Sequence, residues 1–116
     1  MPVVFLVSGE WELRGAVRAE LREAGVQALG MQTVDDMAQT IAGGVVPALV
    51  VVDGSCLQKP QTRQALQSAA RRLPLLIIDS RLYPTPPLPG AQIIRRPVQV
   101  KEIVARVLSM LGGAMC

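Results

Sequence analysis

The sequence has no histidine, and it has only one residue each of tryptophan, tyrosine and phenylalanine among its 116 residues. The lack of histidine excludes a Ser-His type of catalytic triad and removes the commonest general base and zinc ligand. The lack of aromatic rings means that the core must be built from Val, Leu, Ile, Ala and Met. Half of the residues are apolar, which suffices for such a core.

Cysteine is scarce as well, since Cys56 and Cys116 are the only two. Two cysteines make neither a disulfide framework nor a metal cluster, so we expect free thiols in a reducing cytoplasm. No apolar run approaches the ~18 residues of a membrane span. The first residues show neither a basic stretch nor a cleavage site, so no secretory signal is expected. These absences predict a cytoplasmic protein without a membrane partner.

The charges are divided unevenly along the chain. Residues 1–58 carry three arginines against seven carboxylates, whereas residues 59–116 carry nine basic residues against two acidic ones. A basic half can indicate nucleic acid as a partner. Here the basic residues are scattered and no aromatic side chains lie among them to stack on bases. We therefore do not expect direct nucleic-acid binding.

Short apolar runs alternate with segments of helical periodicity. The runs predict strands at 3–7, 26–31, 48–52, 75–78 and 91–94, of which the second is the weakest. The first predicted helix ends at Gly25, the second runs from a Thr33–Asp36 cap to Gly43, the third begins at Pro60, and the last runs from Gln99 to Gly112-Gly113. On the first helix, Arg14, Arg18 and Arg22 form a stripe that we expect to face solvent.

This alternation predicts one α/β domain over residues 1–116, a doubly wound parallel sheet with helices on both faces. The pattern breaks at 81–90, where Pro84, Pro86, Pro87 and Pro89 predict an extended loop instead of a helix. Three large side chains of this loop are candidate anchors for a partner, although packing of the loop on the sheet is the favoured interpretation. They are Leu82, Tyr83 and Leu88.

Ligands of such sheets bind beyond the carboxyl ends of the strands. The residues expected at those ends are Ser8, Gly9, Glu10, Asp53, Asp79, Ser80 and Arg96. The carboxylate of Asp53 could accept a phosphoryl group, bind a cation or cap the following loop, and capping is the default from the residues alone. Trp11 next to this edge is either a gate or a partly buried wedge, and we favour the wedge.

Four segments give the whole chain a resemblance to the receiver domains of response regulators, the CheY-like, flavodoxin-like modules of two-component signalling. These segments are residues 4–14, 49–54, 74–80 and 93–97. The resemblance implies five parallel strands in the order 2-1-3-4-5. Compared with that family, the fourth helix is replaced by the Pro-rich loop.

The resemblance also implies roles for the residues at the strand ends. Asp53 stands where a partner histidine kinase phosphorylates an aspartate. Ser8 and Gly9 stand where an acidic pair holds Mg²⁺, with Glu10 adjacent. Asp79, followed by Ser80, stands where a hydroxyl residue contacts the phosphoryl group. Arg96 replaces a lysine before Pro97, and the Arg96–Pro97 bond is expected to be cis.

The missing acidic pair removes the usual ligands of Mg²⁺, which takes one or two carboxylates, and phosphoryl transfer depends on such cations. Asp53 and Glu10 remain as weak metal candidates. Asp79 would repel phosphoryl oxygens, or form a different cation site with Asp53, or pair with Arg96. If Arg96 pairs with Asp53 instead, the unmodified protein carries an ion pair in its pocket.

We therefore interpret the chain as a degenerate receiver, or pseudo-receiver, that binds a protein without being an enzyme and without a cofactor. The partner would be a histidine kinase, an output protein or a second copy of the chain. One alternative is a working phosphoacceptor that uses Mg²⁺, Asp53, Glu10, Ser80 and Arg96. Another is a small-ligand binder at the same crevice, although the segment Ser8–Trp11 after the first strand has a single glycine and is therefore no Gly-rich phosphate loop.

Overall fold

The computed structural model describes residues 2–79 and 90–114. In these ranges the strands are β1 (Val3–Val7), β2 (Gln27–Met31), β3 (Leu49–Asp53), β4 (Leu75–Asp79) and β5 (Ala91–Arg95). The helices are α1 (Trp11–Glu23), α2 (Val34–Ala42), α3 (Pro60–Ala70) and α4 (Val100–Ala114), with a short 3₁₀ helix, η1 (Gly54–Leu57), after β3. Each predicted strand and helix is present, and η1 was not predicted.

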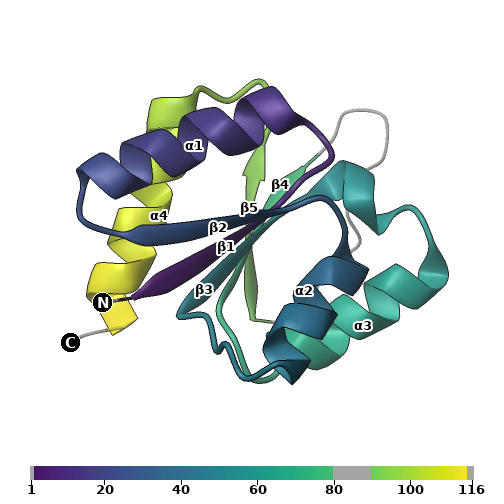
Figure 1. Cartoon of the computed structure of the whole chain (residues 1–116). Helices are drawn as coiled ribbons and strands as arrows, with labels where there is room; N and C mark the ends of the chain where they lie inside the picture. The colour runs from purple at the N-terminus through teal and green to yellow at the C-terminus, as the bar shows by residue number, and fades with distance from the viewer. Residues whose placement is uncertain (1, 80–89, 115–116) are drawn as a thin grey trace.

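All neighbouring strands pair in parallel, in the order β2-β1-β3-β4-β5. Helices α1 and α4 cover one face of the sheet, and α2 and α3 cover the other (Figure 1). The predicted doubly wound, CheY-like fold class is thereby confirmed. The predicted Pro-rich loop in place of a fourth helix falls on residues 80–89, which lie outside the described residues.

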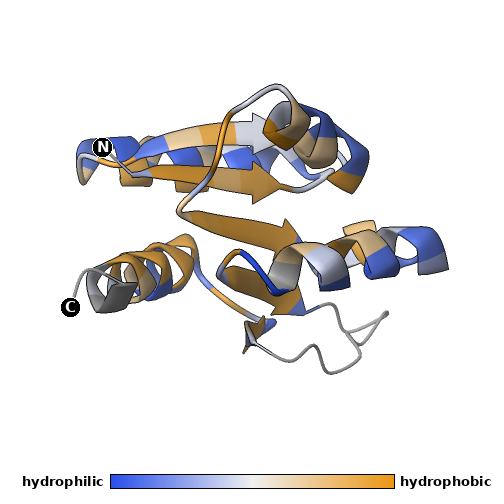
Figure 2. Ribbon diagram, turned by 90° about the horizontal axis from the view of Figure 1, so that it is seen from below, coloured by the Kyte–Doolittle hydropathy of each residue, from blue (hydrophilic) through white to orange (hydrophobic). Residues whose placement is uncertain are grey.

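The apolar strands supply side chains to both faces, because successive residues of a strand point in opposite directions. In β1, Val4 and Leu6 join the cluster under α1 and α4, whereas Phe5 and Val7 join the cluster under α2 and α3. All four are buried. Figure 2 shows the strands as the most hydrophobic layer of the molecule. This double burial is the reason that the strand runs contain no alternating polar residues.

Some helix boundaries follow local signals, and others do not. The Thr33 hydroxyl accepts a hydrogen bond of 3.1 Å from the Asp36 amide and so caps α2. The predicted stop at Gly112-Gly113 is wrong, because α4 continues to Ala114. Glycine disfavours a helix by only ~1 kcal/mol, and neither of these two glycines has a positive φ.

Crossing a bilayer requires a long apolar helix. Within residues 2–79 and 90–114, no helix has both the length and the apolar character for it.

Gly15 within α1 and Gly25 just after it give a matched test of this local structure. Gly15 lies inside the exposed part of α1, where an added Cβ meets nothing within 4 Å. Gly15→Ala should therefore raise the free energy of unfolding by about 0.5–1 kcal/mol. Gly25 has φ +83°, so Gly25→Ala should lower it by about 1–2 kcal/mol. Urea unfolding followed by circular dichroism measures both, and shifts in the same direction would contradict the assignment.

Candidate functional site

The carboxyl ends of β1 and β3 bring Ser8 and Asp53 together. These strands are neighbours in the sheet, with Val7 opposite Val52, so Ser8, which follows β1, meets Asp53, the last residue of β3, at one edge. Asp53 is 1% exposed and Ser8 is 5% exposed. A carboxylate buried this deeply needs hydrogen-bond partners for both oxygens.

Both oxygens of Asp53 have such partners. The Ser8 hydroxyl donates to Asp53 Oδ2 at 3.0 Å, and the Ser55 backbone N–H donates to Oδ1 at 3.2 Å. The second bond makes Asp53 the cap of η1. The capping role expected from the residues alone is therefore present, and its hydrogen bond holds Oδ1 of Asp53 in place.

Arg96 supplies the positive charge of the site. Its Nη2 donates to Asp53 Oδ2 at 3.1 Å and lies 3.6 Å from Glu10 Oε2. The Arg96 side chain is 28% exposed, so solvent screens the pair with Asp53 only in part. The Arg96–Pro97 peptide bond is cis, as predicted. The guanidinium thus bridges the two carboxylates that were the weak metal candidates.

The remaining donors at this edge do not fit a Mg²⁺ ion. Ser8 presents a hydroxyl that is already donated to Asp53, and Gly9 has no side chain. An added Cβ at Gly9 meets nothing within 4 Å, so space is not what keeps a carboxylate out. Among the described residues, no three acidic or cysteine side chains gather closely enough to hold a metal ion. The positive charge that the structure places next to Asp53 is the guanidinium of Arg96.

Arg14 holds the loop that presents Ser8. Its Nη1 donates to the Ser8 carbonyl oxygen at 2.6 Å, and the Ser8 hydroxyl also accepts from the Glu10 amide at 3.0 Å. The expectation that Arg14 faces solvent with Arg18 and Arg22 is wrong, since Arg14 is half-buried.

The Arg14 side chain lies against Gly30 of β2, where an added Cβ would come within 2.9 Å of Arg14 Cδ. Glycine inside a strand often marks the close approach of another group. Gly30 was therefore the available signal in the sequence for the position of Arg14.

Asp79 ends β4 opposite Arg95 of β5 and is half-buried. Ser80 and the three predicted anchors of the Pro-rich loop (Leu82, Tyr83 and Leu88) lie outside the described residues. The roles assigned to Asp79 and to these four residues stay predictions.

Trp11 does not wedge into the fold. It is the first residue of α1 and is 70% exposed, so the favoured interpretation was wrong. The residues of α1 that face the sheet are Leu13, Val17 and Leu21. Trp11 precedes Leu13 by two residues, which places it about 200° around the helix from that stripe.

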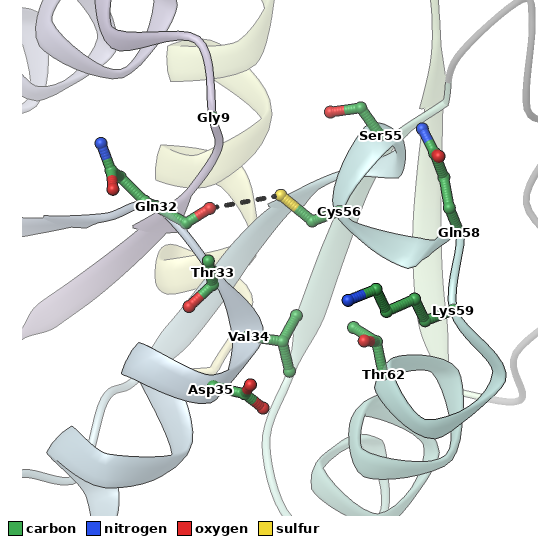
Figure 3. A pocket seen from close by; sticks show the side chains of 10 residues that line it. All are labelled: Gly9, Gln32, Thr33, Val34, Asp35, Ser55, Cys56, Gln58, Lys59 and Thr62. Atoms are coloured by element: carbon green, nitrogen blue, oxygen red, sulfur yellow. Dashed lines mark hydrogen bonds between the residues drawn. The ribbon is translucent and has the colours of Figure 1, made fainter.

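A groove of about 380 Å³ opens beside the site, between the loops after β1 and β2 and the segment from η1 to α3 (Figure 3). Cys56 lies on its wall and donates from Sγ to the Gln32 carbonyl oxygen at 3.6 Å. Lys59 and Thr62 line the opposite side. This groove was not predicted from the sequence, although its residues follow the carboxyl ends of β1, β2 and β3, where ligands of such sheets bind.

Burial raises the pKa of the Cys56 thiol above its ordinary value. A hydrogen bond with the backbone of Gly9 opposes this shift, the negative charge of Asp53 adds to it, and a hydrogen bond with the Ser55 side chain opposes it again. The thiol of Cys56 is free. Because the thiolate is the reactive form, this cysteine should be a slow nucleophile at neutral pH.

Solved structures with the same fold include response regulator receiver domains. A receiver protein from Sinorhizobium medicae WSM419 matches with a TM-score of 0.73 and 18% identity, over 96% of this chain and 94% of that one. A CheY-like receiver domain from Methanospirillum hungatei JF-1 matches with a TM-score of 0.74 and 15% identity, over 96% and 94%. NtrX from Brucella abortus, in complex with ADP, matches with a TM-score of 0.76 and 17% identity, over 99% of this chain but 28% of that one.

No family model matches the sequence, and no curated protein does either. At these identities the structural matches establish the fold, and the chain has the fold of a receiver domain.

The shift of the Cys56 thiol predicts a pH dependence. In a Cys116→Ser variant, the rate of alkylation of Cys56 by iodoacetamide should reach half of its maximum at a higher pH in the folded protein than in urea. The folded state holds the thiol proton more tightly than the unfolded state does, so the neutral thiol contributes to the free energy of unfolding. This contribution is fully present below the pKa that Cys56 has in the unfolded chain, and it is lost as the pH rises through its higher pKa in the folded protein. An equal or lower midpoint in the folded protein would contradict this assignment.

Proposed function

We propose that this chain is a receiver-type signalling module that acts by binding a protein partner, without phosphorylation of Asp53. The partner is a histidine kinase or an output protein of a two-component system. The observation that carries the proposal is the contact of Arg96 Nη2 with Asp53 Oδ2 at 3.1 Å. It neutralises the carboxylate that a kinase would have to modify.

The chemistry of phosphoryl transfer supports this proposal. The transferred group spreads negative charge over its oxygens, and cations must be in place to stabilise it. In this chain Arg96 is already committed to Asp53 and Glu10, and Ser8 and Gly9 offer no carboxylate for Mg²⁺. Asp53 is also 1% exposed, so an incoming phosphodonor would have to displace the guanidinium first.

A phosphodonor assay tests the proposal directly. The protein is incubated with Mg²⁺ and acetyl phosphate, and its intact mass is recorded beside that of Asp53→Asn. We expect no phosphoryl adduct on either protein, and the emission of Trp11 should not respond to Mg²⁺. A phosphoryl adduct on the wild-type chain that is absent from Asp53→Asn would show that Asp53 is a working acceptor.

A rebuilt pocket serves as the positive control for that assay. Ser8→Asp and Gly9→Asp return the acidic pair that the receiver resemblance implies, and Arg96→Lys returns its lysine. Position 9 has open space for a side chain. A phosphoryl adduct on this triple variant, with its fold checked by circular dichroism, shows that the donor and the conditions suffice.

A further inference from the structure

Trp11 forms an exposed aromatic knob with acidic neighbours. Its side chain is 70% exposed, and Glu10 and Glu12 on either side of it are exposed as well. Tryptophan is enriched among the residues that carry binding energy at protein interfaces, because it buries a large apolar area in few rotamers. We call this segment, Glu10–Glu12, the acidic knob.

A groove of matching chemistry lies between α2 and α3, two helices that run side by side (Figure 1). Its volume is about 670 Å³, more than that of the groove beside Cys56. Met37, Ile41 and Ala69 line it with apolar surface. Val46, which is 72% exposed, also lines it, and we call this feature the α2–α3 groove.

The charges of the two features are complementary. The charged residues that line the α2–α3 groove are Arg71 and Arg72, and no carboxylate lines it. Both arginines are exposed, and neither forms a salt bridge within the described part of the chain. In the acidic knob, Glu10 lies 3.6 Å from Arg96 Nη2 of its own chain, so Glu12 carries the carboxylate that is left for a partner. An aromatic side chain with this neighbouring acid fits an apolar groove with basic residues at its side.

The two features lie at opposite ends of the sheet. Trp11 begins α1 at the carboxyl edge, whereas Val46 precedes β3 and Leu73 precedes β4 at the amino edge. Because of this separation, the acidic knob cannot contact the α2–α3 groove of the same chain. A contact between two different patches of identical chains is heterologous, so it repeats from chain to chain instead of closing a symmetric dimer.

We infer that the acidic knob of one chain docks into the α2–α3 groove of a second copy, which joins the chains head to tail. Trp11 enters the apolar groove, and the carboxylate of Glu12 approaches Arg71 and Arg72. This contact goes beyond the proposed function and does not depend on the state of Asp53. It is small, and interfaces below ~1,200 Å² are typically weak and transient.

Sedimentation velocity on a Cys116→Ser background under reducing conditions measures this association without disulfide artefacts. From about 5 to 500 µM, a range suited to weak contacts, the average mass should rise with concentration. The emission of Trp11 should shift to shorter wavelength over the same range, because the ring leaves water. Salt should weaken the association, since the charges at the rim of the contact are screened.

Two variants and their mixture test the head-to-tail geometry. Trp11→Ala removes the knob, and the double variant Arg71→Glu/Arg72→Glu reverses the charge of the groove. Each variant alone should stay monomeric. An equimolar mixture should form a heterodimer and nothing larger, because one intact knob and one intact groove make a single junction. Leu108→Ala, which trims another exposed apolar side chain on α4, is the matched control and should associate like the wild type.

Three results would overturn the inference. They are a wild-type chain that stays monomeric throughout the range, a Trp11→Ala variant that associates as the wild type does, and a mixture that contains only monomers. Circular dichroism of each variant separates loss of the contact from loss of the fold. No Mg²⁺ or phosphodonor is present, so the outcome is independent of the phosphorylation assay.

Discussion

The carboxylate of Asp53, buried at the end of the middle strand, is the constraint on which the rest of the site depends. A buried ion without partners costs several kcal/mol, so its surroundings must supply hydrogen bonds and a counter-charge. Ser8 and Ser55 supply hydrogen bonds, and Arg96 supplies a further hydrogen bond together with the counter-charge. These residues come from three different strand ends, so the carboxylate links the loops after β1, β3 and β5. The parallel sheet makes this convergence possible, because it gathers all of its carboxyl ends at one edge.

The same arrangement is the basis of our proposal that the site serves binding without group transfer. A guanidinium on Asp53 supplies positive charge, but its Nη2 already contacts the carboxylates of Asp53 and Glu10, and it does not coordinate a carboxylate, phosphate oxygens and waters together as Mg²⁺ does. The loop after β1 is adapted to this state. Arg14 holds its backbone through the Ser8 carbonyl oxygen, and the Ser8 hydroxyl is thereby directed at Asp53. Ser8→Asp and Gly9→Asp without a change at Arg96 would place two carboxylates beside a guanidinium that already neutralises Asp53.

Much of the fold could be predicted from the sequence, because doubly buried strands read as continuous apolar runs and Asp53 directly follows one of them. The position of Arg96 also follows from the order of the strands. The role of Arg14 could not be predicted, because Arg18 and Arg22 lie on the same face of the helix. Only Gly30, which is distant in the sequence, distinguishes Arg14 from them. The exposure of Trp11 was missed because a large apolar side chain was expected to be buried. The α2–α3 groove depends on how two helices pack, which no local pattern specifies.

A double-mutant cycle on Asp53 and Arg96 measures whether the guanidinium is the counter-charge of the buried carboxylate. Urea unfolding at neutral pH gives the stability of the wild type, Asp53→Asn, Arg96→Gln and the double variant. If Arg96 is the counter-charge of Asp53, the two residues should couple by about 1–3 kcal/mol, the range for contacting groups in one network. Arg96→Gln would then be costly only while Asp53 is present. A coupling energy near zero would contradict the account, because it would mean that another group compensates the buried carboxylate.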